Sequence, residues 1–236
     1  NNITPDEKHP NDRVLLIDGL NIFLRAFAVN GSLNEKGVPV GGITGFLRSL
    51  TFAIREMEPT RVIVVYDGAG GSKRRKKINP NYELLPVDVY GVDNVEADDV
   101  IAYISQNILE KEVIIMSADQ DFLQLVNDRI VVWSPNKKKY YTEEQIFTEY
   151  GIPAHNFLMY KCLMGDKSDN LEGIKGLGPK KIPKVIPEIT GRELNLDYLI
   201  HYASTQDTLM HQRIVEHKVD LETNEKMMSL KDPLIS

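Results

Sequence analysis

Short apolar runs alternate with longer amphipathic stretches through the first 141 residues. Runs rich in Val, Ile and Leu predict buried strands at residues 13–19, 61–68, 112–121 and 129–134. Between these runs, apolar residues recur at helical spacing over 21–27, 41–57 and 97–111. Because strands that alternate with helices form mostly parallel sheets, the pattern predicts an α/β fold with helices on both sides of a central sheet.

The pattern changes near residue 142. From there, short helical segments are separated by Gly and Pro, and residues 208–228 are typical of one long helix. We therefore predict two regions, an α/β core over 1–141 and a helical region over 142–236.

Composition narrows the class of protein. The 236 residues are enough to bury a sizeable core, and 42% of them are hydrophobic. No apolar run approaches the ~18 residues of a membrane span, and residues 1–13 carry no apolar signal segment. The single cysteine, Cys162, excludes an internal disulfide framework and a cysteine-based zinc site. We expect a reducing, cytoplasmic setting without a membrane partner.

Charge is distributed unevenly along the chain. The net charge of −6 argues against a basic surface over the whole molecule. Lys and Arg nevertheless cluster at 73–77, 137–139 and 175–184, whereas the acids gather elsewhere. This separation favours a local surface for an anionic partner over a generally basic one.

Acidic residues collect where the predicted strands end and where one predicted helix begins. Open parallel sheets place their functional sites at the carboxyl ends of the strands. The acids at these positions or in the helical region are Asp18, Asp67, Glu96, Asp98, Asp99, Asp119, Asp121, Asp166 and Asp169. Any one of them alone is typical of a turn or a helix cap, but nine facing one crevice require another explanation.

Electrostatics points to metal ions. Two like charges ~4 Å apart repel by about 4 kcal/mol at an effective dielectric constant near 20. Several such pairs would offset much of a domain's stability of ~5–15 kcal/mol. Carboxylate ligands without His or Cys suit Mg²⁺ or Mn²⁺. Two such ions can hold the attacking and leaving oxygens of a phosphodiester, so the cluster predicts a two-metal nuclease site.

The segment 173–182, GIKGLGPKKI, predicts a second kind of site. Gly176 and Gly178 lie just before a basic helix start, as in the hairpin of a helix-hairpin-helix motif. Backbone N–H groups there can approach a phosphate, and Lys175, Lys180 and Lys181 add charge. Such a hairpin binds duplex nucleic acid without sequence preference and weakens with salt.

Five motifs in order resemble the 5′-nuclease family. They are LLIDGLN, VVYDG, VEADDVIAYI, SADQDFLQLV and GDKSDNLEGIKGLGPKKI, and the resemblance runs from about residue 13 to about residue 200. The family includes flap endonucleases, phage 5′–3′ exonucleases of the RNase H type and the exonuclease domain of bacterial DNA polymerase I. The phage and bacterial branch is the most similar.

The resemblance implies roles for the acids. One metal group would comprise the residues matching Asp18, Asp67, Glu96, Asp98 and a bridging Asp119. The second would comprise Asp119, Asp121, Asp166 and Asp169, and Asp99 matches a further family acid. The implied reaction is Mg²⁺-dependent hydrolysis at 5′ flaps, nicks or RNA primers during replication or repair. The resemblance also implies a K⁺ ion at the hairpin, bound by backbone oxygens and Ser168.

Residues 70–82 match the stretch that leads into the family's helical arch. Arg74, Arg75 and Lys76 would either contact the scissile phosphate or form a solvated basic loop, to which Lys73 adds charge. Tyr82 matches an aromatic on which a terminal base stacks, and its alternative is an aromatic packed within the loop. After Tyr82 the family has tens of further residues, whereas this sequence continues directly with ELLPVDVYGV. Either the arch is deleted, or residues between Tyr82 and Glu83 are missing from the sequence, which we favour.

Two other functions remain possible from the sequence. A PIN-like ribonuclease shares the acidic sheet edge but lacks the hairpin, and a non-catalytic, structure-specific DNA-binding protein would retain the hairpin and lose the acids. The favoured substrates are DNA with a 5′ flap, nick or overhang and RNA–DNA hybrids. A polymerase, a clamp or a single-strand-binding protein are expected partners, in the host-cell cytoplasm if the gene belongs to a phage.

Overall fold

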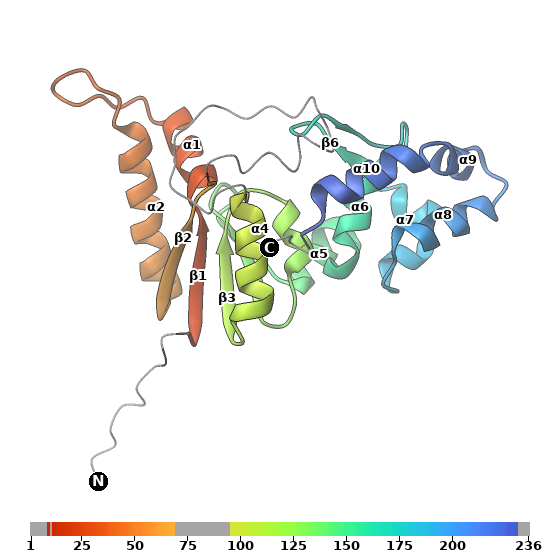
Figure 1. Ribbon diagram of the computed structural model, residues 1–236, viewed down its shortest axis with the longest axis horizontal. Helices are drawn as coiled ribbons and strands as arrows, with labels where there is room; N and C mark the ends of the chain where they lie inside the picture. Colours follow the sequence, from red (N-terminus) through yellow and green to blue (C-terminus); the bar gives the residue numbers. More distant parts are fainter. Residues whose placement is uncertain (1–8, 10, 69–94, 231–236) are drawn as a thin grey trace, which may run out of the picture.

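A five-stranded sheet forms the centre of the first region, in the left half of Figure 1. The structure is a computed structural model that describes residue 9 and residues 11–68 and 95–230. The strands, in the spatial order β2-β1-β3-β4-β5, are β1 (Arg13–Asp18), β2 (Arg61–Val65), β3 (Glu112–Met116), β4 (Ile130–Ser134) and β5 (Lys139–Tyr141). Strands β1 to β4 are parallel, and β5 runs antiparallel to β4. The predicted α/β fold with a mostly parallel sheet is confirmed.

Helices cover both faces of this sheet. They are α1 (Gly19–Val29), α2 (Gly41–Met57) and α4 (Ala97–Tyr103), and α4 continues into a π-helical turn, η1 (Ile104–Ile108). Successive strand residues point to opposite faces. Leu15 and Ile17 accordingly pack in a cluster with residues of α1 and α2, whereas Val14 and Leu16 belong to a larger cluster that includes α4. The sheet is therefore buried on both sides, as its apolar strands require.

The second region is mainly helical, as predicted. Its helices are α5 (Glu143–Tyr150), α6 (Phe157–Met164), α7 (Ile182–Val185), α8 (Leu196–Ser204), α9 (Leu209–Glu216) and α10 (Lys218–Met228). Its shorter elements are the 3-10 helices η3 (Ala154–Asn156) and η4 (Pro187–Thr190) and a two-stranded sheet of β6 (Gly165–Asp166) and β7 (Leu171–Glu172). A further 3-10 helix, η2 (Asp121–Leu125), lies between β3 and β4 of the first region.

The single helix predicted over 208–228 is wrong. His217 departs from helical geometry at ψ 22°, and its ring Nδ1 lies 2.9 Å from the Arg213 carbonyl oxygen. The chain therefore turns between α9 and α10, and α10 lies along α6 (Figure 1). This turn lets α9 bury Ile214 and α10 bury Leu221 and Met227.

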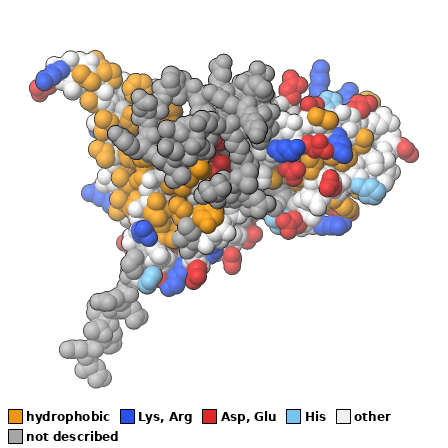
Figure 2. All heavy atoms as spheres, viewed as in Figure 1, with side chains coloured by type: hydrophobic (Ala, Val, Ile, Leu, Met, Phe, Trp, Pro, Cys, Tyr) orange, Lys and Arg blue, Asp and Glu red, His pale blue; other side chains and the backbone are white. Residues whose placement is uncertain are grey.

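Hydrophobic side chains lie exposed over α1, α2 and the segment between them (Figure 2). They include Phe27, Val29, Leu33, Ile43 and Leu47. Among the described residues, no helix combines the length and apolar character that crossing a membrane requires.

Candidate active site

Three neighbouring strands deliver acids to one edge of the sheet. Asp18 is the last residue of β1, where it pairs in register with Val65 of β2, and Ile17 pairs with Met116 of β3. Asp67 and Asp119 follow those two partner residues closely along the chain. Because the strands are parallel, all three carboxylates emerge at the same end, as predicted.

Asp18 is a buried carboxyl group held in place by hydrogen bonds. It caps α1 by accepting from the Asn21 backbone N–H at 3.1 Å, and it accepts from the Ser117 hydroxyl at 3.0 Å. Burial raises the pKa of Asp18 to about 7 despite these bonds, and the nearby charges of Asp119 and Asp98 add to the rise. Burial and the neighbouring acids therefore penalise the ionised form of Asp18, and a bound cation would relieve this penalty.

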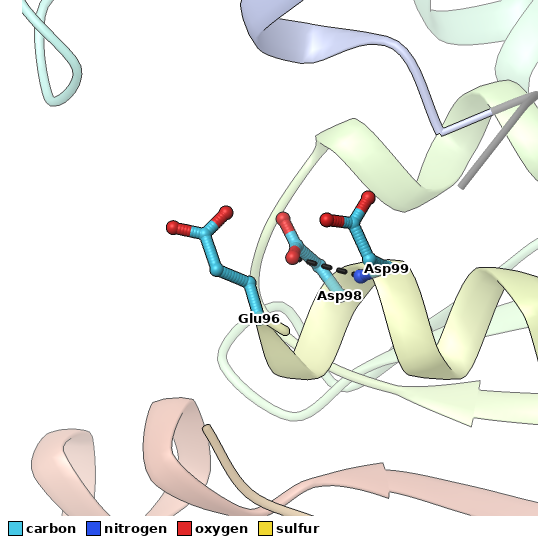
Figure 3. Close-up of side chains that lie close together, drawn as sticks. All are labelled: Glu96, Asp98 and Asp99. Atoms are coloured by element: carbon cyan, nitrogen blue, oxygen red, sulfur yellow. Dashed lines mark hydrogen bonds between the residues drawn. The ribbon is translucent and has the colours of Figure 1, made fainter. Parts of the chain in front are cut away.

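The start of α4 presents three carboxylates together. Ligand oxygens of Glu96, Asp98 and Asp99 all lie within 4.8 Å of one another (Figure 3). Asp67 accepts from the Ala97 N–H at 2.7 Å, so an acid from the β2 loop satisfies a helix donor. The Asp98 carboxylate also accepts from the Asp99 N–H at 2.8 Å. The positive end of the helix dipole favours negative charge at this position but cannot neutralise three carboxylates.

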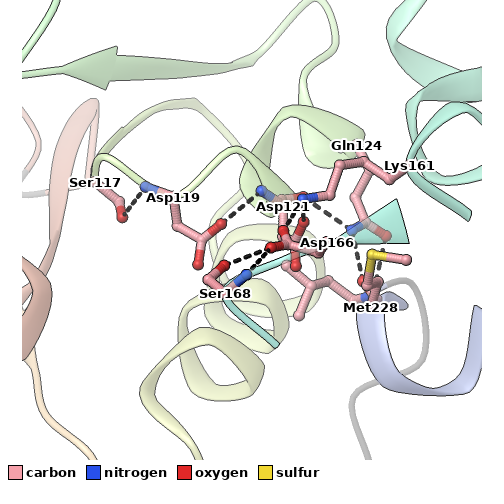
Figure 4. Close-up of polar contacts among 9 residues, drawn as sticks. Ser117, Asp119, Asp121, Gln124, Lys161, Asp166, Ser168 and Met228 are labelled. Atoms are coloured by element: carbon pink, nitrogen blue, oxygen red, sulfur yellow. Dashed lines mark hydrogen bonds and ion pairs between the residues drawn. The ribbon is translucent and has the colours of Figure 1, made fainter. Parts of the chain in front are cut away.

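A second group of acids lies beside the first. Asp121 opens η2, and its N–H donates to Asp119 Oδ1 at 2.9 Å. Asp166, on β6, accepts from the Ser168 N–H at 2.8 Å and from the Ser168 hydroxyl (Figure 4). Asp169 is half-buried in the same turn. The structure thus brings Asp121 and Asp166 together from segments more than forty positions apart in the sequence.

Lys161 joins these two acids and is absent from the sequence prediction. Its Nζ lies 2.9 Å from Asp121 Oδ1, outside hydrogen-bond geometry, and it forms a second ion pair with Asp166. Burial would lower the pKa of Lys161, but Asp121 and Asp166 outweigh it and raise that pKa. For Asp166, hydrogen bonds from Lys161 and Ser168 outweigh burial and lower the pKa. The only signal in the sequence is one lysine within the otherwise apolar 157–164 run.

The segment predicted to be a hairpin contributes residues 176–181 to an open depression of about 620 Å³. Gly176 has φ +86°, which favours glycine, and its carbonyl accepts from Lys181 Nζ at 3.0 Å. Lys175 and Lys180 are exposed, and Gly178 has open space where a Cβ would lie. Arg213, which the sequence analysis missed, donates to the Lys175 carbonyl at 3.1 Å and so braces the hairpin from α9.

The predicted arch residues Lys73, Arg74, Arg75, Lys76 and Tyr82 lie outside the described residues. The remaining predicted site residues lie in two places, at the acidic edge of the sheet and in the hairpin segment.

The acidic edge fits divalent metal. Its donors are carboxylate oxygens, three of which converge at α4, and the buried Asp18 has a strongly raised pKa. Mg²⁺ and Mn²⁺ prefer such oxygen ligands.

Comparison with known proteins places this arrangement in a family. The family model described as "5′-3′ exonuclease, N-terminal resolvase-like domain" matches residues 13–84 and 77–151. The match therefore comes in two pieces that overlap at 77–84, beside the departure from the family pattern after Tyr82.

Curated relatives agree with this match. The 5′-3′ exonuclease of Bacillus subtilis is 30% identical over 251 residues, which cover 93% of this chain and 83% of the relative. Because 93% of 236 residues is about 219, roughly 30 positions of that alignment have no counterpart in this chain. The thermostable DNA polymerase I of Thermus caldophilus is 35% identical over 203 residues, and the chain spans 24% of its length.

Solved structures share the fold. The bacteriophage T5 D15 protein co-crystallised with metal ions superposes with a TM-score of 0.76 at 20% identity, covering 93% of this chain and 90% of the other. The T5 D15 flap endonuclease in complex with DNA and metal ions gives a TM-score of 0.73 at 19% identity, covering 93% and 89%. With its family match, its relatives and its acidic sheet edge, the chain belongs to the 5′-3′ exonuclease family of 5′-nucleases.

Proposed function

We propose that this protein is a structure-specific 5′-nuclease that hydrolyses phosphodiester bonds at 5′ flaps, nicks or RNA primers during DNA replication or repair. The observation that carries the proposal is the meeting of carboxylates from β1, the β2 loop, α4 and the β3 loop at one edge of the sheet. The T5 relative, whose complex holds DNA and metal ions, supports this assignment of the edge.

Two groups of acids would hold two Mg²⁺ ions, for which Mn²⁺ would substitute. Asp18, Asp67, Glu96 and Asp98 form the first group, with Asp119 between the groups and Asp99 as a further acid. Asp121, Asp166 and Asp169 form the second. When bound, such ions polarise a phosphodiester and lower the pKa of an attacking water. The protein's own part is to fix these oxygens, as Asn21 and Ser117 do for Asp18 and Ala97 does for Asp67.

The hairpin would bind the nucleic-acid duplex. Lys175, Lys180 and Lys181 lie exposed around a depression whose glycines let a phosphate approach the backbone. We include in the proposal a K⁺ ion at this hairpin, near Ser168, and contacts of Arg74, Arg75 and Tyr82 with the 5′ strand. RNase H activity, a cytoplasmic setting and partnership with a polymerase, a clamp or a single-strand-binding protein belong to the same proposal.

The test is cleavage of a 5′-labelled flap duplex, beside an RNA–DNA hybrid, with Mg²⁺ and with EDTA. We expect short 5′ products only with Mg²⁺. Asp67→Asn, which keeps an acceptor for the Ala97 N–H, should lower the cleavage rate by about 100-fold or more and leave duplex affinity unchanged. Asp128→Asn removes the same charge at an exposed position and is the matched control. Tight binding without cleavage by the wild type would favour the non-catalytic function.

A further inference from the structure

Lys161 is a buried lysine inside a group of acids. Its side chain is 10% exposed, and the neighbouring α6 residues Leu158, Cys162 and Leu163 are buried. Helix α6 is itself fixed by Asn224 of α10, whose side-chain amide donates to the Cys162 carbonyl at 3.0 Å. The ammonium is therefore held in place by the packed core of the helical region.

The charge of Lys161 is compensated by Asp121 and Asp166 from two other elements (Figure 4). A buried ammonium is costly unless it is paired, and removing either acid would leave the lysine short of a partner. Lys161 in turn compensates the negative charge of the two carboxylates before any metal ion binds, because this cation is part of the chain. The pKa of Lys161 is raised and that of Asp166 is lowered, as this pairing requires, whereas at Asp121 burial and the charge of Asp119 outweigh Lys161 and raise the pKa to about 7.

A divalent ion that approaches this group meets ligands already paired with a positive charge. The ion would be repelled by the ammonium or would have to displace it, and displacement would leave a buried charge unpaired. An ion that arrives with an anionic phosphate brings compensating negative charge of its own. The balance of charges therefore differs between the protein alone and the protein with nucleic acid.

We propose that Lys161 is a built-in cation that, through its ion pairs with Asp121 and Asp166, keeps the second acid group weak for divalent ions until a nucleic-acid phosphate is present. This inference rests on the proposed function of the acidic edge. In it, Lys161 is a positioning residue that acts through the acids. The second ion is thereby recruited together with the substrate rather than stored in the free protein.

The experiment is a titration of the DNA-free protein with Mn²⁺, with free Mn²⁺ measured by electron paramagnetic resonance. We expect wild type to show a tighter and a weaker class of site. Lys161→Met removes the charge at similar side-chain length and should tighten the weaker class by about 10-fold or more while leaving the tighter class unchanged. Lys167→Met makes the same charge change at an exposed position beside Asp166 and should alter neither class by more than about 2-fold.

A second variant keeps the inference testable if Lys161→Met folds poorly. Lys161→Arg keeps the charge and should keep the weaker class weak, so tightening by Lys161→Arg would overturn the inference. Unchanged or weaker Mn²⁺ binding by a folded Lys161→Met would overturn it as well. Adding a duplex with a 5′ phosphate should strengthen the weaker class in wild type more than in Lys161→Met, and an equal effect would count against the inference. If no variant binds Mn²⁺ at all, the proposed metal-dependent function itself fails, and the two failures are distinguishable.

Discussion

Asp18 links the acidic edge to the stability of the whole protein. Its pKa is raised from the ordinary 3.8 to about 7 in the folded state. Between those values the folded protein holds a proton that the unfolded chain has lost, so the free energy of unfolding falls as pH rises through this window. We expect the metal-free protein to be less stable at pH 8 than at pH 5, with Asp18 contributing about 1–3 kcal/mol.

Urea unfolding in EDTA at the two pH values measures this difference. Asp18→Asn should reduce the pH dependence without abolishing it, since burial also raises the pKa of Asp121. Added Mg²⁺ should restore stability at pH 8, because metal binds the ionised acids and releases protons. A pH dependence identical in wild type and Asp18→Asn would contradict the assignment.

The two hairpin glycines should respond differently to alanine. Gly176 has φ +86°, a conformation that L-residues rarely adopt, so Gly176→Ala should cost about 1 kcal/mol of stability and distort the turn. Gly178 has no atoms within 4 Å of an added Cβ, so Gly178→Ala should leave stability unchanged. The added methyl projects into the space that a phosphate would occupy, so duplex affinity should fall by about 10-fold in low salt.

Thermal unfolding and fluorescence anisotropy with a labelled duplex separate these effects. Gly191→Ala, at an exposed glycine with open space and no positive φ, is a control for the loss of glycine alone. Unaltered duplex affinity of Gly178→Ala would discredit the hairpin as a phosphate site.

Asp18, Asp67 and Asp119 were predictable from the sequence because each follows the end of an apolar run. Chain direction in a parallel sheet then places Asp18, Asp67 and Asp119 at one edge. Lys161 was not predictable, because it acts through the spatial meeting of α6, η2 and β6 and lies in a run whose apolar pattern indicates only a buried helix. Arg213 was missed for the same reason, since its partner is a backbone carbonyl on another element.

At the scale of elements, α10 is fixed by buried amides. Asn224 donates to the Cys162 carbonyl at 3.0 Å and to the Glu172 carbonyl at 2.9 Å, which ties α10 to both α6 and β7. Asn224→Ala would leave the buried Cys162 carbonyl and the part-buried Glu172 carbonyl without this donor, so we expect a loss of about 1–3 kcal/mol in the free energy of unfolding. Lys226→Ala, on the exposed face of α10, should change it by less than about 0.5 kcal/mol.

Chemical denaturation of the two variants checks this expectation. Equal stability of Asn224→Ala and Lys226→Ala would show that the amide contacts are weak. Cleavage should fall in Asn224→Ala as well, because α6 carries Lys161 and leads directly into Asp166.

Element boundaries were predictable where the local pattern decides them. Helix α2 spans residues 41–57 as predicted, since its apolar positions keep helical spacing and Glu58 ends it in a left-handed conformation. Strand β5 was missed because its lysine-rich sequence resembles a solvated loop. In the structure Lys137 and Lys139 pair with Glu149 on α5, and Tyr141 is buried. The turn at His217 separates α9 from α10 although the apolar positions keep helical spacing through it, so no local pattern predicts it.

At the scale of the molecule, one hydrophobic core crosses the boundary near residue 142. A single cluster of buried residues contains Leu16 and Ile115 from the sheet and Leu199, Ile214 and Met227 from the helices. We therefore expect calorimetry to show one cooperative transition, with a calorimetric enthalpy close to the van 't Hoff enthalpy. Two separate transitions would mean that the regions on either side of the boundary fold independently.

The contacts of Leu230 have a consequence for the order of biosynthesis. Its side chain is fully buried, its N–H donates to Gln124 Oε1 at 3.0 Å, and its carbonyl accepts from Gln106 at 2.9 Å. The same Gln124 amide also donates to the carbonyl of Asp121 at 2.8 Å. The backbone at Asp121, a predicted metal ligand, is thus held through Gln124 by residues that are translated more than a hundred codons later. A nascent chain that has not yet released residues 228–230 should therefore leave this backbone unsupported, and the acidic edge should be completed only once this late segment has docked.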